Sequence, residues 1–149
     1  MLRTSLRRLL QDREGVAALE FSIIGVFMVT LMLAAYDLGN AAQEQVALQQ
    51  AVRAGGAYAA SYPTDPNGIA LRVTNALPAT WSLPSAPTVV CQCLNSATGA
   101  TSDTTCTAPV CTTDAKMITI TATMPYTSLT TLFAGVIPAN TARYVVRYQ

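Results

Sequence analysis

The feature that most constrains this chain is an apolar run of 21 residues from Val16 to Tyr36, whose polar interruptions are only Glu20, Ser22 and Thr30. As an α-helix it would extend roughly 31 Å, close to the hydrocarbon thickness of a bilayer. A chain of 149 residues forms too small a core to bury such a helix on all sides. The run therefore predicts a transmembrane helix.

The charges around this run predict its orientation. Arg3, Arg7, Arg8 and Arg13 all precede it. By the positive-inside rule, the N-terminus lies in the cytoplasm and the residues after Asp37 lie across the membrane, which predicts a single-pass membrane protein with an extracytoplasmic head. A cleaved secretory signal is the alternative, but the run is longer than the usual apolar region of such signals and no A-x-A site closes it.

The amino-acid composition argues against several classes of function. The chain has no histidine, which removes Ser-His-Asp and Cys-His catalysis and imidazole metal sites. A formal net charge of +1 lacks the basic excess that nucleic-acid binding requires. We therefore expect neither an enzyme nor a nucleic-acid partner, and no cofactor.

The apolar run is expected to continue as a helix beyond the membrane. All eight prolines lie at or after Pro63, so none breaks a helix before Ala60. We expect the Gly55-Gly56 pair to fray the last turns, and Pro63 to end the helix. Along one side of this continuation fall small and apolar residues, namely Ala41, Leu48, Val52, Gly55 and Ala59.

The remaining chain predicts a small α+β head. Ile69, Val73 and Leu77 recur at helical spacing, whereas residues 88–91, 116–124 and 143–148 have the composition or alternation of strands. Between the last two lies an apolar link that fits a helical turn or a flap, with Leu129, Leu132, Phe133, Val136 and Ile137. We expect an antiparallel sheet laid against the outer part of the long helix, and four segments: leader 1–15, membrane helix 16–36, its continuation 37–62, and head 63–149.

Four cysteines, Cys91, Cys93, Cys106 and Cys111, lie in a loop-rich part of the predicted head. An even number of cysteines in an extracytoplasmic compartment favours two disulfides. Three pairings are possible, and Cys91 with Cys93 is disfavoured because side chains two apart along a strand would close a very short, strained ring. A four-thiolate zinc site is the alternative, but the spacing lacks paired C-x2-C motifs.

Glu20 is the residue that most needs an explanation. An acidic side chain at the centre of a membrane helix costs about 2.5 to 3.5 kcal/mol, so such groups are functional candidates by default. The structural alternative is that Glu20, near the start of the run, simply reaches the headgroup layer.

Glu20 also lies five residues after Gly15, the last residue of the basic leader. The stretch Arg13-Glu14-Gly15-Val16-Ala17-Ala18-Leu19-Glu20-Phe21 resembles type IV pilins, and most of all the TadE-like minor pseudopilins of tight-adherence systems, in which a G-x4-E-F core is usual. The resemblance covers about 40 residues and includes the leader, the cleavage site and the membrane helix. Beyond residue 60 no diagnostic motif supports it.

This resemblance implies a structural role. A prepilin peptidase would cut between Gly15 and Val16, and Glu20 and Phe21 would take part in assembly. The Glu20 carboxylate would neutralise the new amine of Val16, either on a neighbouring subunit or within the same chain. The partners implied are this peptidase, other pilins or pseudopilins, and the secretion platform. The protein would act in the inner membrane or in an extracellular pilus used for attachment. Its length favours a minor subunit over the shorter major pilins.

Two other classes stay open on sequence alone. The first is an unprocessed single-span binding or sensor protein. The second is an extracytoplasmic enzyme or metal carrier that uses the four cysteines.

Overall fold

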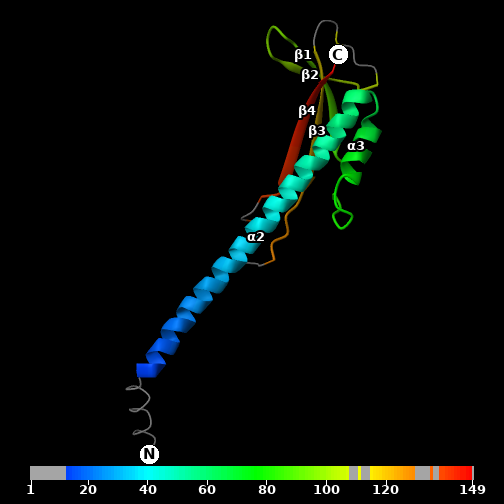
Figure 1. The fold of residues 1–149 in the computed structure, drawn as a ribbon. Helices are drawn as coiled ribbons and strands as arrows, with labels where there is room; N and C mark the ends of the chain where they lie inside the picture. The colour runs from blue at the N-terminus through cyan, green and yellow to red at the C-terminus, as the bar shows by residue number, and fades with distance from the viewer. Residues whose placement is uncertain (1–12, 108–110, 112–114, 130–134, 136–137, 149) are drawn as a thin grey trace, which may run out of the picture. The chain divides into compact units, whose positions relative to one another are not determined.

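The computed structural model describes residues 13–107, 111, 115–129, 135 and 138–148. By internal contacts the chain divides into a first unit, Met1–Gly39, and a second unit, Asn40–Gln149, each of which is described by itself. The elements are helices α2 (Arg13–Ser61) and α3 (Pro66–Asn75) and strands β1 (Thr88–Leu94), β2 (Thr101–Thr104), β3 (Ala115–Met124) and β4 (Asn140–Tyr148) (Figure 1). The predicted α+β class is confirmed.

Helix α2 contributes to both units and contains 49 residues. It begins at Arg13, three residues before the predicted start of the membrane helix, and it ends at Ser61, where Pro63 prevents further helix as predicted. In the second unit one face of α2 is buried, and Leu48, Val52 and Ala59 on this face are at most 1% exposed. The helical spacing of these positions explains why this face was predictable.

The Gly55-Gly56 pair does not fray α2, contrary to the prediction, because its residues lie inside the helix at its closest packing contacts. A side-chain carbon on Gly55 would meet Val73 of α3, and one on Gly56 would meet the ring of Tyr144 on β4. The absence of side chains here lets α3 and the sheet approach the helix backbone. The packing gained offsets the low helix propensity of glycine.

Helix α3 is short and is fixed at its start by proline and aspartate. Pro66 occupies the first turn, and the Asp65 carboxylate accepts a hydrogen bond from the backbone N–H of Gly68 at 2.9 Å. Ile69 and Val73, predicted as its inward face, are fully buried. Figure 1 shows α3 alongside the C-terminal part of α2.

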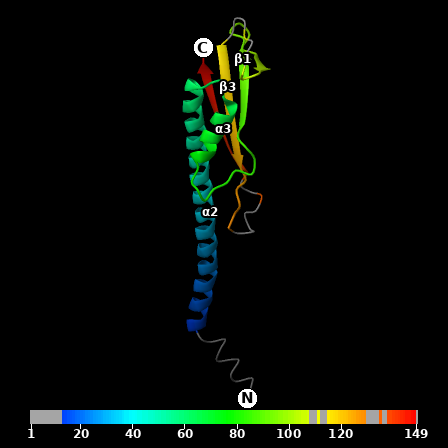
Figure 2. The same ribbon diagram turned by 90° about the vertical axis from the view of Figure 1, so that its right-hand side faces the viewer.

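The four strands form one antiparallel sheet in the order β2-β1-β3-β4, and Figure 2 shows β1 and β3 side by side. The buried face of β3 consists of Ile118, Ile120, Ala122 and Met124, as its alternation predicted. Ile118 lies opposite Val146 of β4, and Ile120 lies opposite Tyr144. Strand β2 was not predicted, because its sequence Thr-Ser-Asp-Thr has no apolar alternation.

Two disulfides join β1 to the chain that follows it. Cys91 bonds to Cys106 and Cys93 bonds to Cys111, with Cα separations of 5.2 and 5.7 Å. Cys91 is part of the core, with 1% of its surface exposed. The expected pair of disulfides is confirmed, and the structure selects one of the pairings that the sequence left open.

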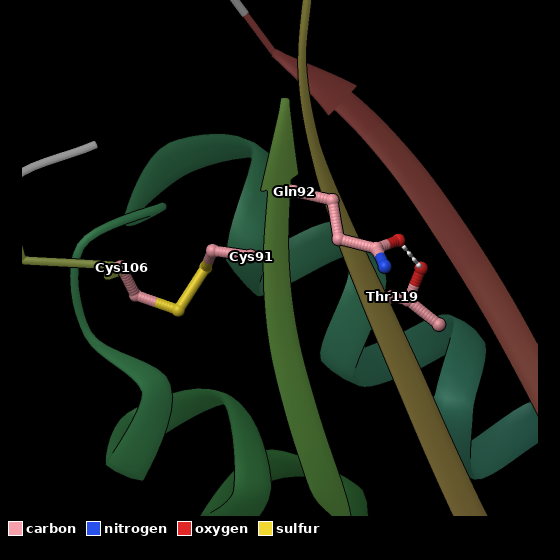
Figure 3. Close-up of a disulfide and its surroundings, with 4 residues drawn as sticks. All are labelled: Cys91, Gln92, Cys106 and Thr119. Carbon is pink, nitrogen blue, oxygen red and sulfur yellow. Dashed lines mark hydrogen bonds between the residues drawn. A yellow bond between two sulfur atoms is a disulfide. The ribbon is translucent and has the colours of Figure 1, made fainter. Parts of the chain in front are cut away.

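The opposite face of the sheet includes a group of hydrogen-bonded polar side chains. Figure 3 shows Gln92 and Cys91 leaving β1 on opposite sides. The Gln92 amide donates to the Asp103 carboxylate of β2 at 2.8 Å and accepts from the Thr119 hydroxyl of β3 at 3.2 Å. One side chain thereby joins three strands.

Part of the predicted apolar link lies outside the described residues, namely Leu132, Phe133, Val136 and Ile137. Leu129 is described, and 68% of its surface is exposed. The predicted helical turn or flap over this segment stays a prediction.

Candidate functional site: the membrane and assembly segment

Helix α2 is the only helix among the described residues that is long and apolar enough to cross a membrane. Large apolar side chains are exposed on every side of its N-terminal part. Val16 is 58% exposed, Phe21 77% and Met32 76%, and no residue of the most apolar window is buried within the chain. A helix that is apolar all round and uncovered by its own chain requires lipid or other protein around it.

The hydroxyl groups of this segment are satisfied within the helix. Ser22 donates to the backbone carbonyl of Leu19 at 2.8 Å, and Thr30 donates to that of Phe27 at 2.8 Å. Such bonds let a hydroxyl enter a lipid environment without an unpaired donor. Two of the three polar interruptions noted in the sequence therefore need no partner outside the helix.

Glu20 is the third interruption, and it differs from the other two. Its side chain is exposed, and within the described part of the chain no hydrogen bond or ion pair reaches it. A buried or lipid-embedded carboxylate without a partner is costly, whereas a paired one is tolerated. A partner from outside the described chain would lower this cost, and contact with the headgroup layer is the alternative.

Val16 supplies a position for such a partner. It lies four residues before Glu20 in α2, so both residues lie on one face of the helix. A free amine on Val16 would arise only if the Gly15–Val16 bond were cut. Gly15 and Val16 both have helical backbone in the uncut chain. Glycine lowers helix propensity by about 1 kcal/mol relative to alanine, which makes local unwinding at this bond easier.

Phe21 follows Glu20 directly and is the most exposed large apolar residue of the segment. A ring this exposed offers a large apolar surface for burial against lipid or another helix. The structure thus places Gly15, Val16, Glu20 and Phe21 within two turns of one helix. Their roles in cleavage and assembly stay predictions.

In the second unit a group of side chains stabilises the turn between α2 and α3. The Tyr58 hydroxyl donates to the Asp65 carboxylate at 3.0 Å, and the guanidinium carbon of Arg72 lies 5.3 Å from the centre of the Tyr58 ring. The ring of Tyr62 stacks on that of Tyr58 at 4.9 Å. The hydrogen bond to Asp65, followed by burial, raises the pKa of Tyr58 above its ordinary value.

The second unit also contains a recess of about 280 Å³, which was not predicted from the sequence. Among the described residues, Glu44 is the one charged residue that lines it, and the other lining residues are Trp81, Ser82, Pro84, Met124, Pro125 and Thr127. These residues come from three distant segments, so no local motif marks them. The single tryptophan of the chain was the one available signal.

Comparison with known families identifies one match. A family model described as TadE-like protein matches residues 15–57, which lie within α2. The match confirms the resemblance noted from the G-x4-E-F stretch, and it leaves the sheet and the disulfides outside its range. Curated proteins and solved structures give no match.

Proposed function

We propose that this chain, which is TadE-like over residues 15–57, is a minor pilin-like subunit that takes part in assembly of a tight-adherence pilus. A prepilin peptidase removes the leader after Gly15, and the mature chain begins at Val16. The exposed apolar part of α2 provides the membrane anchor and the packing surface. Other pilins or pseudopilins and the secretion platform are its partners.

The observation that supports this proposal most directly is that the Glu20 carboxylate lacks a partner among the described residues. Ser22 and Thr30 are satisfied by their own helix, and Glu20 alone among the polar interruptions has no partner in the described chain. Cleavage creates an ammonium group on Val16. Two opposite charges about 4 Å apart attract by roughly 4 kcal/mol at an effective dielectric constant of about 20, before the desolvation cost is subtracted.

The second unit fits an extracytoplasmic head. Two disulfides persist in an oxidising compartment and are rare in the cytoplasm. The arginines before the membrane helix favour a cytoplasmic N-terminus. Together they support a single-pass protein of the bacterial inner membrane, whose head reaches the periplasm or an extracellular pilus.

Substitution of Glu20 tests the assembly role. Glu20→Gln keeps the side-chain volume and removes the charge, so we expect insertion into the membrane to be retained. Recovery with the pilus fraction should fall at least about tenfold, which corresponds to the loss of about 1.4 kcal/mol of pairing free energy.

Ser22→Ala is the matched control, because the Ser22 hydroxyl is bonded to its own helix. We expect this variant to assemble normally. Normal recovery of Glu20→Gln with the pilus fraction would contradict the role of Glu20 in assembly.

A further inference from the structure

The recess of the second unit brings together one carboxylate and several apolar surfaces. We propose that it binds the ammonium group of a lysine side chain presented by another protein. The recess is lined by Glu44 of α2, by Trp81 and Pro84 from the segment between α3 and β1, and by Met124 and Pro125 at the end of β3. All of them belong to the second unit, so the site does not depend on the first.

The carboxylate of Glu44 is held in place from one side. Its Oε2 accepts a hydrogen bond from the side-chain amide of Asn140 at 3.2 Å. Asn140 is buried, with 8% of its surface exposed, and its amide also approaches the backbone carbonyl of Ala41 at 3.5 Å. No other hydrogen bond or ion pair to Glu44 occurs among the residues that the structure describes. The second carboxylate oxygen thus remains available to a ligand.

The remaining walls suit the methylene chain that carries an ammonium group. Trp81 packs against the hydrophobic core and is half-buried. An indole face attracts cations, and Met124 with Pro84 and Pro125 adds apolar surface for a methylene chain. A carboxylate among such surfaces selects a basic side chain over an acidic or a purely apolar one.

Lysine fits this arrangement better than arginine. A guanidinium group binds a carboxylate best when both oxygens are free for two parallel hydrogen bonds. In Glu44 one oxygen is already bonded to Asn140. An ammonium group is a compact charge and needs only one oxygen, so it makes a full contact with the oxygen that remains.

The source of the lysine is a different chain. This protein has one lysine, Lys116, which is half-buried on β3 opposite Cys93 and Tyr148. A second copy therefore has no fully exposed lysine to offer. The inference rests on the proposed function only in taking the partner to be another protein of the same assembly.

The chain contains its own reporter for this site, since Trp81 is the only tryptophan. The full chain in a neutral maltoside detergent is titrated with N-acetyl-lysine amide while tryptophan fluorescence is recorded. N-acetyl-norleucine amide, which has the methylene chain without the ammonium group, is the matched ligand control. We expect a saturable change with lysine amide, at a dissociation constant of order 1 to 10 mM, and none with norleucine amide.

Glu44→Gln should weaken lysine binding at least tenfold, whereas Gln43→Ala, at the exposed neighbouring position of α2 outside the recess, should leave it within twofold. Arginine amide should bind more weakly than lysine amide. The comparison of lysine with norleucine uses the unaltered chain, so it decides the matter even if Glu44→Gln fails to fold. Equal responses to these two ligands, or none to either, would overturn the proposal, and tighter binding of arginine amide would overturn the choice of lysine.

Glu20→Gln separates this proposal from the assembly role. Because Glu20 lies in the first unit, we expect this variant to bind lysine amide as the unaltered chain does. Loss of assembly with intact lysine binding would leave the recess proposal standing. Normal assembly of Glu20→Gln with intact lysine binding would overturn only the assembly role.

Discussion

At the scale of single residues, the informative positions are those that depart from their surroundings. Glu20 in an apolar helix and the four cysteines in a loop-rich head were identifiable in the sequence because each is chemically unusual where it stands. Asn140 and Glu44 were not identifiable, since their hydrogen bond joins residues 96 positions apart. The Gly55-Gly56 pair was wrongly predicted to fray the helix. The sequence shows that these positions lack side chains, but it does not show that Val73 and Tyr144 pack against them.

Gly55 gives a stability prediction at this scale. Gly55→Val places its new atoms against Val73, which is fully buried, and near Ile120. A branched side chain cannot be accommodated there without displacing α3, so the free energy of unfolding should fall by about 2 kcal/mol or more. Denaturant unfolding in detergent, followed by Trp81 fluorescence, measures the change.

Ala54→Val is the control for Gly55→Val, because Ala54 is the exposed neighbour in the same helix. It should cost no more than about 0.7 kcal/mol, the range of ordinary helix propensities. If both variants lose the same free energy of unfolding, the close approach of α3 is not the reason that position 55 requires glycine.

Tyr58 gives a pH prediction. Its pKa is raised in the folded chain by the hydrogen bond to Asp65, and the ionised phenolate cannot donate that bond. The stabilisation is therefore fully present below the ordinary tyrosine pKa of about 10 and is lost as pH rises through the higher folded-state pKa. The melting temperature of the unaltered chain should exceed that of Tyr58→Phe near neutral pH, and the difference should shrink as the pH is raised past about 10.

Burial raises the pKa of Tyr148 as well, so it adds pH dependence of the same sign, and it does so equally in the unaltered chain and in Tyr58→Phe. Tyr62→Phe is the control, since Tyr62 stacks on Tyr58 without sharing its hydrogen bond. A constant difference between the unaltered chain and Tyr58→Phe across this pH range would contradict the assigned role of Asp65.

At the scale of elements, the helices and strands that could be predicted from the sequence are those whose apolar residues recur at a regular spacing. The inward faces of α2 and β3 were predictable because their apolar residues recur at helical spacing in α2 and at every second position in β3. Strand β2 was not, because only its pairing with β1 and the neighbouring disulfide define it. The turn before it is set by Asn95, whose side chain accepts hydrogen bonds from the backbone of Ala97 and Thr98.

The disulfides give a prediction at this scale. The crosslinks span 15 and 18 residues, and loops of that length contribute about 3 kcal/mol each on the chain-entropy model. Replacing both Cys93 and Cys111 by alanine should lower the free energy of unfolding by about that amount. The same change at Cys91 and Cys106 should cost more, because Cys91 also fills the core.

Denaturant unfolding of the two double variants measures this difference, and the unaltered chain treated with a reductant is the comparison. The reduced chain should be less stable than either double variant. Unchanged stability after loss of either disulfide would contradict the view that the crosslinks stabilise the head.

At the scale of the whole molecule, the two units differ in how their apolar side chains are used. The second unit buries them in one core between α2, α3 and the sheet, and the first unit exposes them along a helix that its own chain does not cover. Hydropathy revealed this contrast from the sequence. Hydropathy could not predict the contacts within the head, because no local sequence pattern specifies which distant segments pack together.

The proposed assembly role depends on cleavage before Val16, which converts the backbone amide of this residue into an amine that Glu20 neutralises. The most direct test is N-terminal sequencing, with intact mass, of the protein recovered from native membranes that contain an active prepilin peptidase. We expect the chain to begin at Val16, and we expect Gly15→Leu to retain the leader because a large residue replaces glycine at the cut. Recovery of the unaltered protein with Met1 and its arginines still attached would contradict the account.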